Sequence, residues 1–352
     1  MGNQKIIPEI IFLSTGYRGG ALKFMEQHIG FLTKKKLNIT LVDQNPSKNF
    51  PYLNHNKIKI IRFSLFNKVS NSKKQLKLLL NNKKKKIIFF TNFVIYVRYY
   101  FFFRSLCKNN IKFFLTIHSG VLNFTIKRYF AAFAFSFIAK NINYLFFGSH
   151  SAKNWWTSNF PWFSCKKYKI IYNGIEIPKK KILLKKNILN VSFVGRLEKE
   201  NNPKLFLQLA KESFLKNNKF NFHVFGNGSL LNSLKKEYSL YAKFYNWKKL
   251  NEIYRVTDLL VITSYVNNFP YAALEAKSYG VPVLSCSKGD ISKIIENNKD
   301  GYLISVTNPR ILLEYLIKMS DNYCSLVKHS LKTRYKYNVN NSCNKFWNSI
   351  LL

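Results

Sequence analysis

The sequence predicts an α/β protein with two doubly wound domains, each built on a parallel sheet. Short apolar runs alternate with longer helical stretches, and the alternation restarts after a basic stretch from Pro178 to Asn190. The apolar runs are nearly continuous, which is typical of strands buried on both faces of a parallel sheet. A chain of 352 residues also suits two domains of roughly 150 residues each.

The two blocks of alternation define the expected elements. In the first block we expect strands at residues 10–14, 39–42, 58–63, 87–91, 113–117 and 144–147, and helices at residues 21–34, 73–81, 124–139 and 151–159. In the second block we expect strands at residues 191–194, 220–225, 242–245, 259–263 and 281–285, and helices at residues 205–216, 230–238, 250–257 and 271–279. The expected domains are residues 1–178 and 179–335, followed by a C-terminal helix at 336–352 that packs back on the first domain.

The net charge of +41 fits an anionic partner such as nucleic acid or a membrane surface. A second interpretation stays open, because Lys is abundant together with Asn, Ile, Phe and Tyr, which all have A/T-rich codons. Basic runs such as Lys83–Lys86 are then expected in solvated loops. The basic residues are spread through both halves without a nucleic-acid motif, so we expect no nucleic-acid partner. An anionic membrane is the expected peripheral contact.

The cysteines and the apolar segments indicate a cytoplasmic protein. The five cysteines are scattered and form no Cys-x-x-Cys pair, which argues against a disulfide framework and a cysteine zinc site. The start of the chain has no signal-peptide pattern. Two apolar segments, 87–103 and 129–147, are interrupted by Arg98 and Lys140, so neither offers about 18 uninterrupted apolar residues for a membrane span.

Open α/β sheets bind ligands beyond the carboxyl ends of their strands, so we expect the chemistry at the strand-to-helix turns. The first turn contains Gly16, Gly19 and Gly20, and it can bring backbone N–H groups close to an anion or simply allow tight packing. His118 ends a later strand beside Ser119. It can donate a hydrogen bond to a sugar hydroxyl, or it can be structural.

The second domain opens with a turn at Gly195 and Arg196. An arginine supplies planar, permanently charged donors that suit a diphosphate. The alternative role is a surface ion pair with Glu198 or Glu200. A further glycine-rich turn at residues 225–229 is also explained by turn chemistry alone.

The segment from Ser264 to Ala276 is the most informative. A strand ends, a loop follows from Asn267 to Pro270, and a helix begins near Tyr271, whose first N–H groups suit a phosphate. Glu275 lies one turn into that helix among small apolar residues. A buried carboxylate needs a partner, so we expect a ligand such as a ribose diol, or another partner, at Glu275.

Together these turns resemble the retaining glycosyltransferases of family GT4. The resemblance implies the GT-B fold, with two facing Rossmann-like domains and an interdomain cleft. It extends over nearly the whole chain and is strongest from Tyr172 to Gly301. The segments that match family motifs are 172–176 (Asn-Gly-Val-Asp element), 193–197 (Gly-Arg-Leu motif), and 258–264 and 267–283 (donor-binding signature).

The resemblance assigns roles by position. His118 and Asn267 would lie at the reacting sugar as the catalytic residues. The donor would be bound by Gly19, Gly20, Gly195, Arg196, Asn201, Trp247, Phe269, Pro270, Tyr271 and Glu275, with Arg196 at the diphosphate, Glu275 at the ribose and Trp247 near the base. Asp-x-Asp is absent, so we expect no metal or other cofactor.

Two positions depart from the family pattern. Asn267 stands where the family has the first of two glutamates, and Asn201 stands where it has a lysine. The predicted function is retaining transfer of a hexose or N-acetylhexosamine from a nucleotide diphosphate sugar, with UDP as the expected nucleotide, to a glycan or lipid-linked glycan acceptor of the cell envelope such as lipopolysaccharide. The alternatives are a catalytically weakened nucleotide-sugar-binding protein, suggested by the two asparagines, and a basic nucleic-acid-binding protein, suggested by charge alone.

Overall fold

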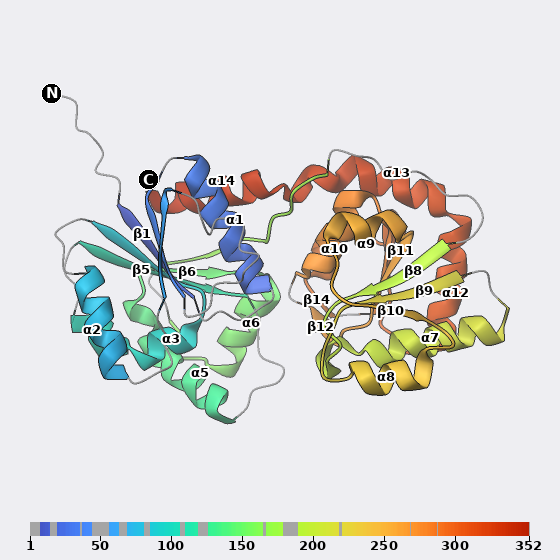
Figure 1. The fold of residues 1–352 in the computed structure, drawn as a ribbon, viewed down its shortest axis with the longest axis horizontal. Helices are drawn as coiled ribbons and strands as arrows, with labels where there is room; N and C mark the ends of the chain where they lie inside the picture. The colour runs from blue at the N-terminus through green and yellow to red at the C-terminus, as the bar shows by residue number, and fades with distance from the viewer. Residues whose placement is uncertain are drawn as a thin grey trace. The chain divides into compact units, whose positions relative to one another are not determined.

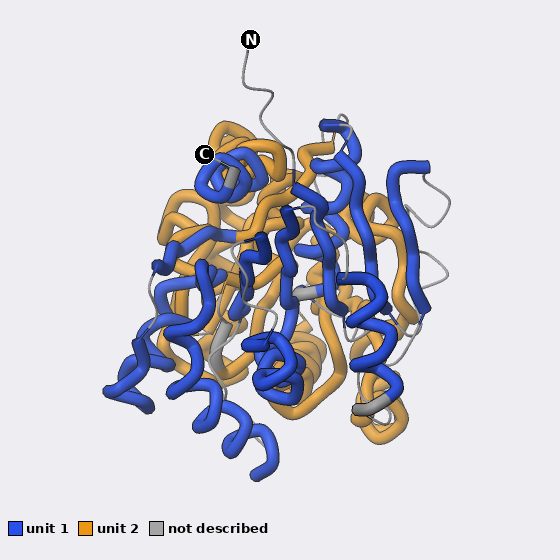
Figure 2. The backbone as a smooth tube through the Cα atoms, turned by 90° about the vertical axis from the view of Figure 1, so that its left-hand side faces the viewer, with its two compact units in different colours: residues 1–172, 342–352 blue, residues 173–341 orange. Residues whose placement is uncertain are grey.

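A computed structural model describes most of the chain. The described residues are 8–14, 20–35, 37–43, 56–62, 69–80, 85–105, 110–118, 126–164, 167–178, 189–217, 220–267, 269–286 and 288–351. The chain divides into two compact units, unit 1 with residues 1–172 and 342–352, and unit 2 with residues 173–341 (Figure 2). The sequence-based boundaries are 178/179 and 335/336, a few residues from those of the two units.

Unit 1 contains a parallel sheet with the strand order β3-β2-β1-β4-β5-β6-β7. Its strands are β1 (Glu9–Leu13), β2 (Ile39–Val42), β3 (Ile58–Ile61), β4 (Lys86–Phe90), β5 (Ile111–Ile117), β6 (Tyr144–Phe147) and β7 (Tyr168–Ile170). Its helices are α1 (Gly20–Lys34), α2 (Val69–Leu80), α3 (Phe93–Arg98), α4 (Tyr100–Ser105), α5 (Ile126–Ile138) and α6 (His150–Asn159), together with most of α14 (Val339–Leu351).

Alternate residues of a strand point to opposite faces, so the buried central strands of this sheet contribute to two apolar layers. One layer holds Phe12 and Phe89, which contact Trp347 of α14. The other holds Phe90 and Phe113, which pack with residues of α3, α4, α5 and α6. Figure 1 shows these helices on the two sides of the sheet. The near-continuous apolar runs of the sequence are explained by this double burial.

Unit 2 contains a second parallel sheet with the order β10-β9-β8-β11-β13-β15 and a short pair, β12 and β14. Its strands are β8 (Leu189–Val194), β9 (Phe220–Phe225), β10 (Lys243–Tyr245), β11 (Leu259–Ile262), β12 (Val266–Asn267), β13 (Val283–Ser285), β14 (Lys288–Gly289) and β15 (Gly301–Leu303). Its helices are α7 (Pro203–Leu215), α8 (Leu231–Tyr238), α9 (Leu250–Val256), α10 (Tyr271–Tyr279), α11 (Ile291–Ile294), α12 (Pro309–Asp321) and α13 (Tyr323–Thr333), with short 3₁₀ turns at Lys199–Asn201 and Arg334–Tyr337.

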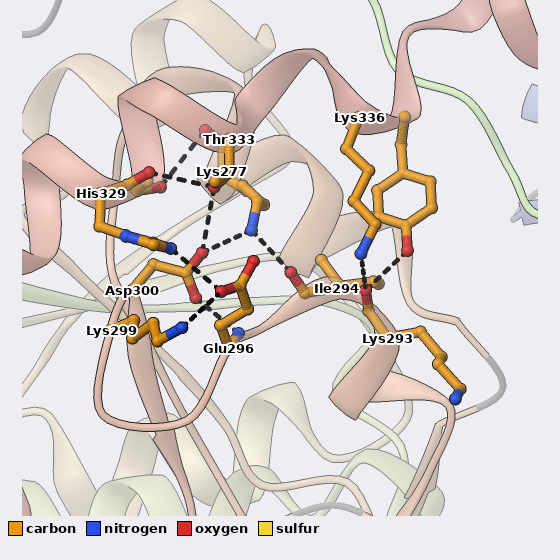
Figure 3. A network of polar contacts seen from close by, with 11 residues as sticks. Lys277, Lys293, Ile294, Glu296, Lys299, Asp300, His329, Thr333 and Lys336 are labelled. Carbon is orange, nitrogen blue, oxygen red and sulfur yellow. Dashed lines mark hydrogen bonds and ion pairs between the residues drawn. The ribbon is translucent and has the colours of Figure 1, made fainter.

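Helix α10 is buried over most of its length, and two of its buried residues carry charge, Glu275 and Lys277. The Lys277 ammonium donates to the Asp300 carboxylate at 2.5 Å and to the Ile294 carbonyl at 2.8 Å. The other Asp300 oxygen accepts the backbone N–H of Glu296 at 2.8 Å. Figure 3 shows this network. A buried ion pair repays its desolvation only when the remaining polar atoms are also bonded, as they are here.

The structure adds elements that the sequence patterns did not indicate. In the segment 87–103 the strand β4 was expected, whereas the helices α3 and α4 were not. The strands β7, β12, β14 and β15 and the helices α11, α12 and α13 were not expected either. The placement of Lys86 in a solvated loop was wrong, because it begins β4 and is 1% exposed. Strand β4 lies between β1 and β5, so the whole strand is covered.

Replacing Asp300 by Asn should destabilise unit 2 by about 3–5 kcal/mol, since the Lys277 charge would stay buried without its counter-ion. The double variant Lys277→Met/Asp300→Asn should lose less, because no buried charge is left. Scanning calorimetry of the two variants and the wild type measures both effects. Equal losses for the single and the double variant would contradict the coupling of this pair.

Candidate functional site

The candidate site residues of unit 2 lie at one edge of its sheet. Because the strands are parallel, the segments that follow β8, β9, β10 and β11 all leave from the same, carboxyl edge. Gly195 and Arg196 follow β8, and Trp247 lies in the segment after β10, where it is about half exposed. The loop that leads from β11 to α10 completes this edge (Figure 1).

Glycines bring two of these loops into direct contact. A Cβ at Gly226 would lie 1.9 Å from the carbonyl oxygen of Gly195, and one at Gly228 would lie 2.5 Å from that of Leu197. The backbone N–H of Leu197 donates to the carbonyl of Asn227 at 3.0 Å. The glycines after β9 therefore permit a close approach that any side chain would prevent, beyond ordinary turn formation.

Arg196 is exposed and forms an ion pair with Glu200, with 2.9 Å between its Nη2 and the carboxylate. Glu200 is one of the two ion-pair partners that the sequence suggests for Arg196. The other, Glu198, instead accepts the backbone N–H and the hydroxyl of Ser229 at 2.9 and 2.6 Å. These hydrogen bonds lower the pKa of the Glu198 carboxyl. An exposed ion pair contributes at most about 1 kcal/mol, so Arg196 can exchange Glu200 for a stronger anion.

Asn201 holds the loop that presents Arg196. Its side-chain amide donates to the carbonyl of Arg196 at 2.8 Å, and its own carbonyl accepts the hydroxyl of Thr263 at 3.0 Å. The same hydroxyl lies 2.9 Å from the carbonyl of Asn202. These bonds tie the loop after β8 to the end of β11. The amide at this position therefore has a local structural role that a lysine would not reproduce.

The segment before α10 has a strained backbone. Phe269 has φ +70°, a left-handed conformation that is a genuine outlier for a bulky residue. Its ring is buried edge-on against Tyr337 at 5.0 Å, and its carbonyl accepts the side-chain amide of Asn173 at 3.3 Å. Pro270 then caps α10 without a side-chain hydrogen bond. Helix N-termini without a side-chain cap attract anions through their first N–H groups.

Glu275 is buried, as the surrounding apolar residues predicted. Its carboxylate accepts the Tyr254 hydroxyl at 3.1 Å, and that hydroxyl also lies 3.1 Å from the Ala272 carbonyl. Burial and the nearby Glu275 carboxylate raise the pKa of Tyr254, so the phenol stays a donor. The role of Glu275 at a ribose stays a prediction.

Unit 1 contributes His118, which follows β5 at the carboxyl edge of its own sheet. The residue keeps partial exposure, yet both of its ring nitrogens are buried with no hydrogen-bond partner among the described residues. The ring packs edge-on against Phe24 at 4.6 Å, and Phe24 contacts His28 at 4.0 Å. Burial lowers the pKa of His118 to about 4 and that of His28 to about 3, with a smaller contribution from His118 to the latter.

Other predicted site residues are placed in part. Gly20 begins α1 and is exposed, whereas Gly19 lies outside the described residues. Asn267 pairs with Gly289 through the backbone of β12 and β14, and its side chain lies outside the described part. Tyr254 and Asn173 were not among the predicted site residues. The sequence gives no signal for Tyr254, because its contact with Glu275 joins two helices. Asn173 lies within a family element, but its bond to the Phe269 carbonyl appears only in the folded structure.

The described part of the chain contains neither a metal-binding cluster nor a membrane-spanning helix. No group of three or more His, Cys, Asp or Glu residues there could hold a metal ion. No helix in that part is long and apolar enough to cross a membrane.

Residues 175–340 match the model of the family Glycosyl transferases group 1. The chain is similar to this family over that segment, and its two parallel-sheet units have the GT-B fold. The fold assignment is supported by the structure of HepE from Anabaena in complex with UDP-glucose, with a TM-score of 0.77, 14% identity, and coverage of 97% of this chain and 100% of that one.

Two of the curated relatives from Escherichia coli illustrate the similarity. One is a UDP-Gal:alpha-D-GlcNAc-diphosphoundecaprenol alpha-1,3-galactosyltransferase, 29% identical over 178 residues, or 44% of this chain and 46% of that enzyme. The other is the O-antigen biosynthesis glycosyltransferase WbnH, 28% identical over 163 residues and 46% of each protein. The matches thus span about half the length of these relatives.

The buried histidines predict that unit 1 loses stability in acid. Their pKa values in the folded protein, about 4 for His118 and about 3 for His28, lie below the unfolded value of about 6.5. As the pH falls below 6.5, the unfolded chain binds protons that the folded chain does not. Stability should therefore fall by up to about 1.4 kcal/mol per pH unit for each histidine.

Urea unfolding between pH 7 and pH 4.5, followed by tryptophan fluorescence, measures this slope in unit 1, which holds four of the five tryptophans. The variant His28→Phe keeps an aromatic ring beside Phe24 and removes one titrating group, so its slope should be smaller. Identical slopes for the wild type and the variant would contradict the prediction.

Proposed function

We propose that the chain is a retaining GT4-type glycosyltransferase that moves a hexose or N-acetylhexosamine from a UDP-sugar to a lipid-linked envelope glycan. One observation carries the proposal. At the carboxyl edge of unit 2, neighbouring strands β8 and β11 present the exposed guanidinium of Arg196 and the N-terminus of α10, whose cap residue Pro270 forms no side-chain hydrogen bond. A cation beside the positive end of a helix dipole suits a diphosphate.

In this proposal the donor lies along that edge. Arg196 releases Glu200 and binds the diphosphate, and the backbone N–H groups of Phe269 and Tyr271, on either side of Pro270, donate to the same phosphates. The strained φ of Phe269 is consistent with such a role, because strained backbone is concentrated at ligand sites. UDP as the nucleotide is supported by the similarity to structures that contain it.

Below the phosphates, Glu275 accepts the ribose hydroxyls while Tyr254 holds its carboxylate, and the exposed ring of Trp247 lies toward the base. Gly195 keeps this edge free of a side chain beside the diphosphate. His118, with Gly19 and Gly20, would act from the carboxyl edge of unit 1. Asn267 takes the position beside the transferred sugar.

The reaction itself needs no protein nucleophile. The acceptor hydroxyl attacks the anomeric carbon on the face from which the diphosphate departs, the glycosidic bond to the diphosphate breaks, and the departing phosphate takes the hydroxyl proton. The protein then contributes orientation and stabilisation of the diphosphate charge. His118 is neutral near pH 7, since its pKa is about 4, so it acts as a hydrogen-bond partner of the sugar.

A nucleotide-sugar-binding protein with weak transfer activity is the second candidate. It is favoured by Asn201, which stands at the position of a GT4 lysine and donates its amide to the Arg196 carbonyl. The site therefore has one cation, Arg196, where the GT4 pattern has two. Comparing UDP-sugar hydrolysis and transfer with UDP binding separates the two candidates. Tight binding without any turnover across a panel of acceptors would favour the second.

Arg196→Ala should weaken UDP binding by about 1.5–3 kcal/mol, the range for hydrogen bonds to a charged group. Glu200→Gln is the matched control, because it removes the ion-pair partner and keeps the guanidinium, and it should leave binding equal or tighter. Isothermal titration with UDP measures both. Unchanged affinity in Arg196→Ala would mean that the guanidinium only forms a surface pair.

Glu275→Gln should lower the affinity for UDP-sugar while the protein stays folded, because the amide keeps the shape and loses the charge. Tyr254→Phe is the matched control, since it removes the hydroxyl that holds Glu275 but no group proposed to touch the ribose. A comparison of UDP with deoxy-UDP by titration gives the ribose contribution. The ratio of the dissociation constants of deoxy-UDP and UDP should fall about tenfold in Glu275→Gln and by less in Tyr254→Phe. A ratio that is unchanged in Glu275→Gln would place the ribose elsewhere.

A further inference from the structure

Helix α5 of unit 1 exposes an apolar face. Ala132, Phe135 and Ser136 of this helix are buried, whereas the opposite side is open and consists of large side chains at helical spacing. Ile126 is 77% exposed and Phe130 66% exposed. We define the aromatic patch as Ile126, Tyr129, Phe130, Phe133, Phe137 and the neighbouring Trp162, all of them exposed. Large exposed apolar patches mark interaction sites.

The aromatic patch is held rigidly. The Trp162 ring stacks on Phe137 at 5.4 Å with an interplanar angle of 17°, and it contacts Phe133 edge-on at 5.8 Å. Its indole N–H donates to the Ser136 hydroxyl at 2.8 Å. Since that N–H is already bonded, the ring can enter an apolar medium without leaving a polar group unpaired.

Basic residues flank the aromatic patch at both ends of α5. Lys127 and Arg128 are exposed in the first turn, and Lys140 is exposed just beyond the last. At that second end the Tyr100 hydroxyl accepts the Asn141 amide at 2.9 Å and lies 3.4 Å from the guanidinium of Arg104. Arg104 therefore lies beside the C-terminal end of α5.

The surrounding sequence has no negative charge to oppose these cations. Between Asp43 and Glu176 the chain contains no Asp or Glu. Unit 1 as a whole has three acidic residues, Glu9, Glu26 and Asp43, against 30 Lys and Arg. An anionic surface would therefore be attracted to unit 1 without local repulsion.

We propose that the aromatic patch on α5 is a docking surface for an anionic lipid bilayer. Aromatic rings, tryptophan above all, favour the boundary between headgroups and acyl chains, and Lys and Arg favour the anionic headgroups around them. The patch is apolar along its centre and basic at its ends, which fits a bilayer. A nucleic acid would require basic residues along a groove between its stacking rings. Helix α5 has 13 residues, so it lies on the bilayer surface.

The proposal depends on unit 1 alone and does not rest on sugar transfer. It goes beyond attraction by overall charge, because it assigns the contact to one helix face and adds apolar insertion. Failure of UDP to bind would leave it intact, and failure of membrane binding would leave the donor site intact.

The test uses the full chain and sedimentation with vesicles of phosphatidylcholine containing 30–40% phosphatidylglycerol, at about 0.1 M salt. The double variant Ile126→Ser/Phe130→Ser should lower partitioning about tenfold or more, from the loss of two large inserted side chains. Its control is Leu240→Ser, which changes an exposed leucine of unit 2 and should have no effect. Circular dichroism and the melting temperature show that each variant is folded.

The charge is tested with Lys127→Gln/Arg128→Gln, which should weaken binding to the anionic vesicles by about fivefold per residue. Its matched control is Lys235→Gln/Lys236→Gln on α8, with an equal charge change on unit 2. Vesicle partitioning that is unchanged in both α5 double variants would overturn the proposal. Displacement of the protein from the vesicles by single-stranded nucleic acid would overturn it as well. Vesicle-independent dimers that Ile126→Ser/Phe130→Ser dissolves would assign the patch to a second copy of the chain and would also overturn it.

Discussion

The organisation of unit 2 depends on a buried helix that carries two charges. Glu275 and Lys277 are two positions apart on α10, which places them about 200° apart around the helix axis. Each is buried, and each needs its own partner on a different side, Tyr254 for Glu275 and Asp300 for Lys277. Leaving either one unpaired would cost several kcal/mol. The two partners together therefore fix the rotation of α10 and, through it, the position of its N-terminus.

The backbone just before α10 is the second constraint. Unlike the charge pairs, its conformation by itself raises the free energy of the folded state. The left-handed backbone of Phe269 costs of the order of 1–3 kcal/mol. Full burial of its ring contributes about 1.5–3 kcal/mol in return, and the amide of Asn173 bonds its carbonyl. The strain persists because these contacts over-determine the conformation. A helix end held in this way has little freedom to adjust, which is the property that a preorganised phosphate site requires.

The features of this arrangement that leave a local signal could be predicted from the sequence. Contacts between residues far apart in the chain could not. Apolar runs predicted the two sheets because burial on both faces leaves a local signal, and the carboxyl-edge rule located Arg196 and His118 correctly at strand ends. The burial of Glu275 followed from its apolar neighbours. Its partner did not, because Tyr254 lies 21 positions away on another helix.

The same limit explains why Lys277 was overlooked and Lys86 misplaced. The ammonium of Lys277 is satisfied by Asp300 and the carbonyl of Ile294, contacts that only the tertiary fold creates. Lys86 follows three other lysines, and the run resembled a solvated loop. Local sequence shows that a charged residue lies among apolar or basic neighbours, but it does not show whether the fold will cover it.

The distribution of acidic residues bears on the origin of the net charge. Lys and Arg are almost equally numerous in the two units, 30 in unit 1 and 27 in unit 2, whereas 13 of the 16 acidic residues lie in unit 2. Biased codon usage would act on both units alike, so it accounts for the abundance of lysine but not for this asymmetry. Several unit 2 acids have specific partners, among them Glu198, Glu200 and Asp300. Unit 1 lacks such acids over the whole stretch that surrounds α5, where an anionic partner would meet them.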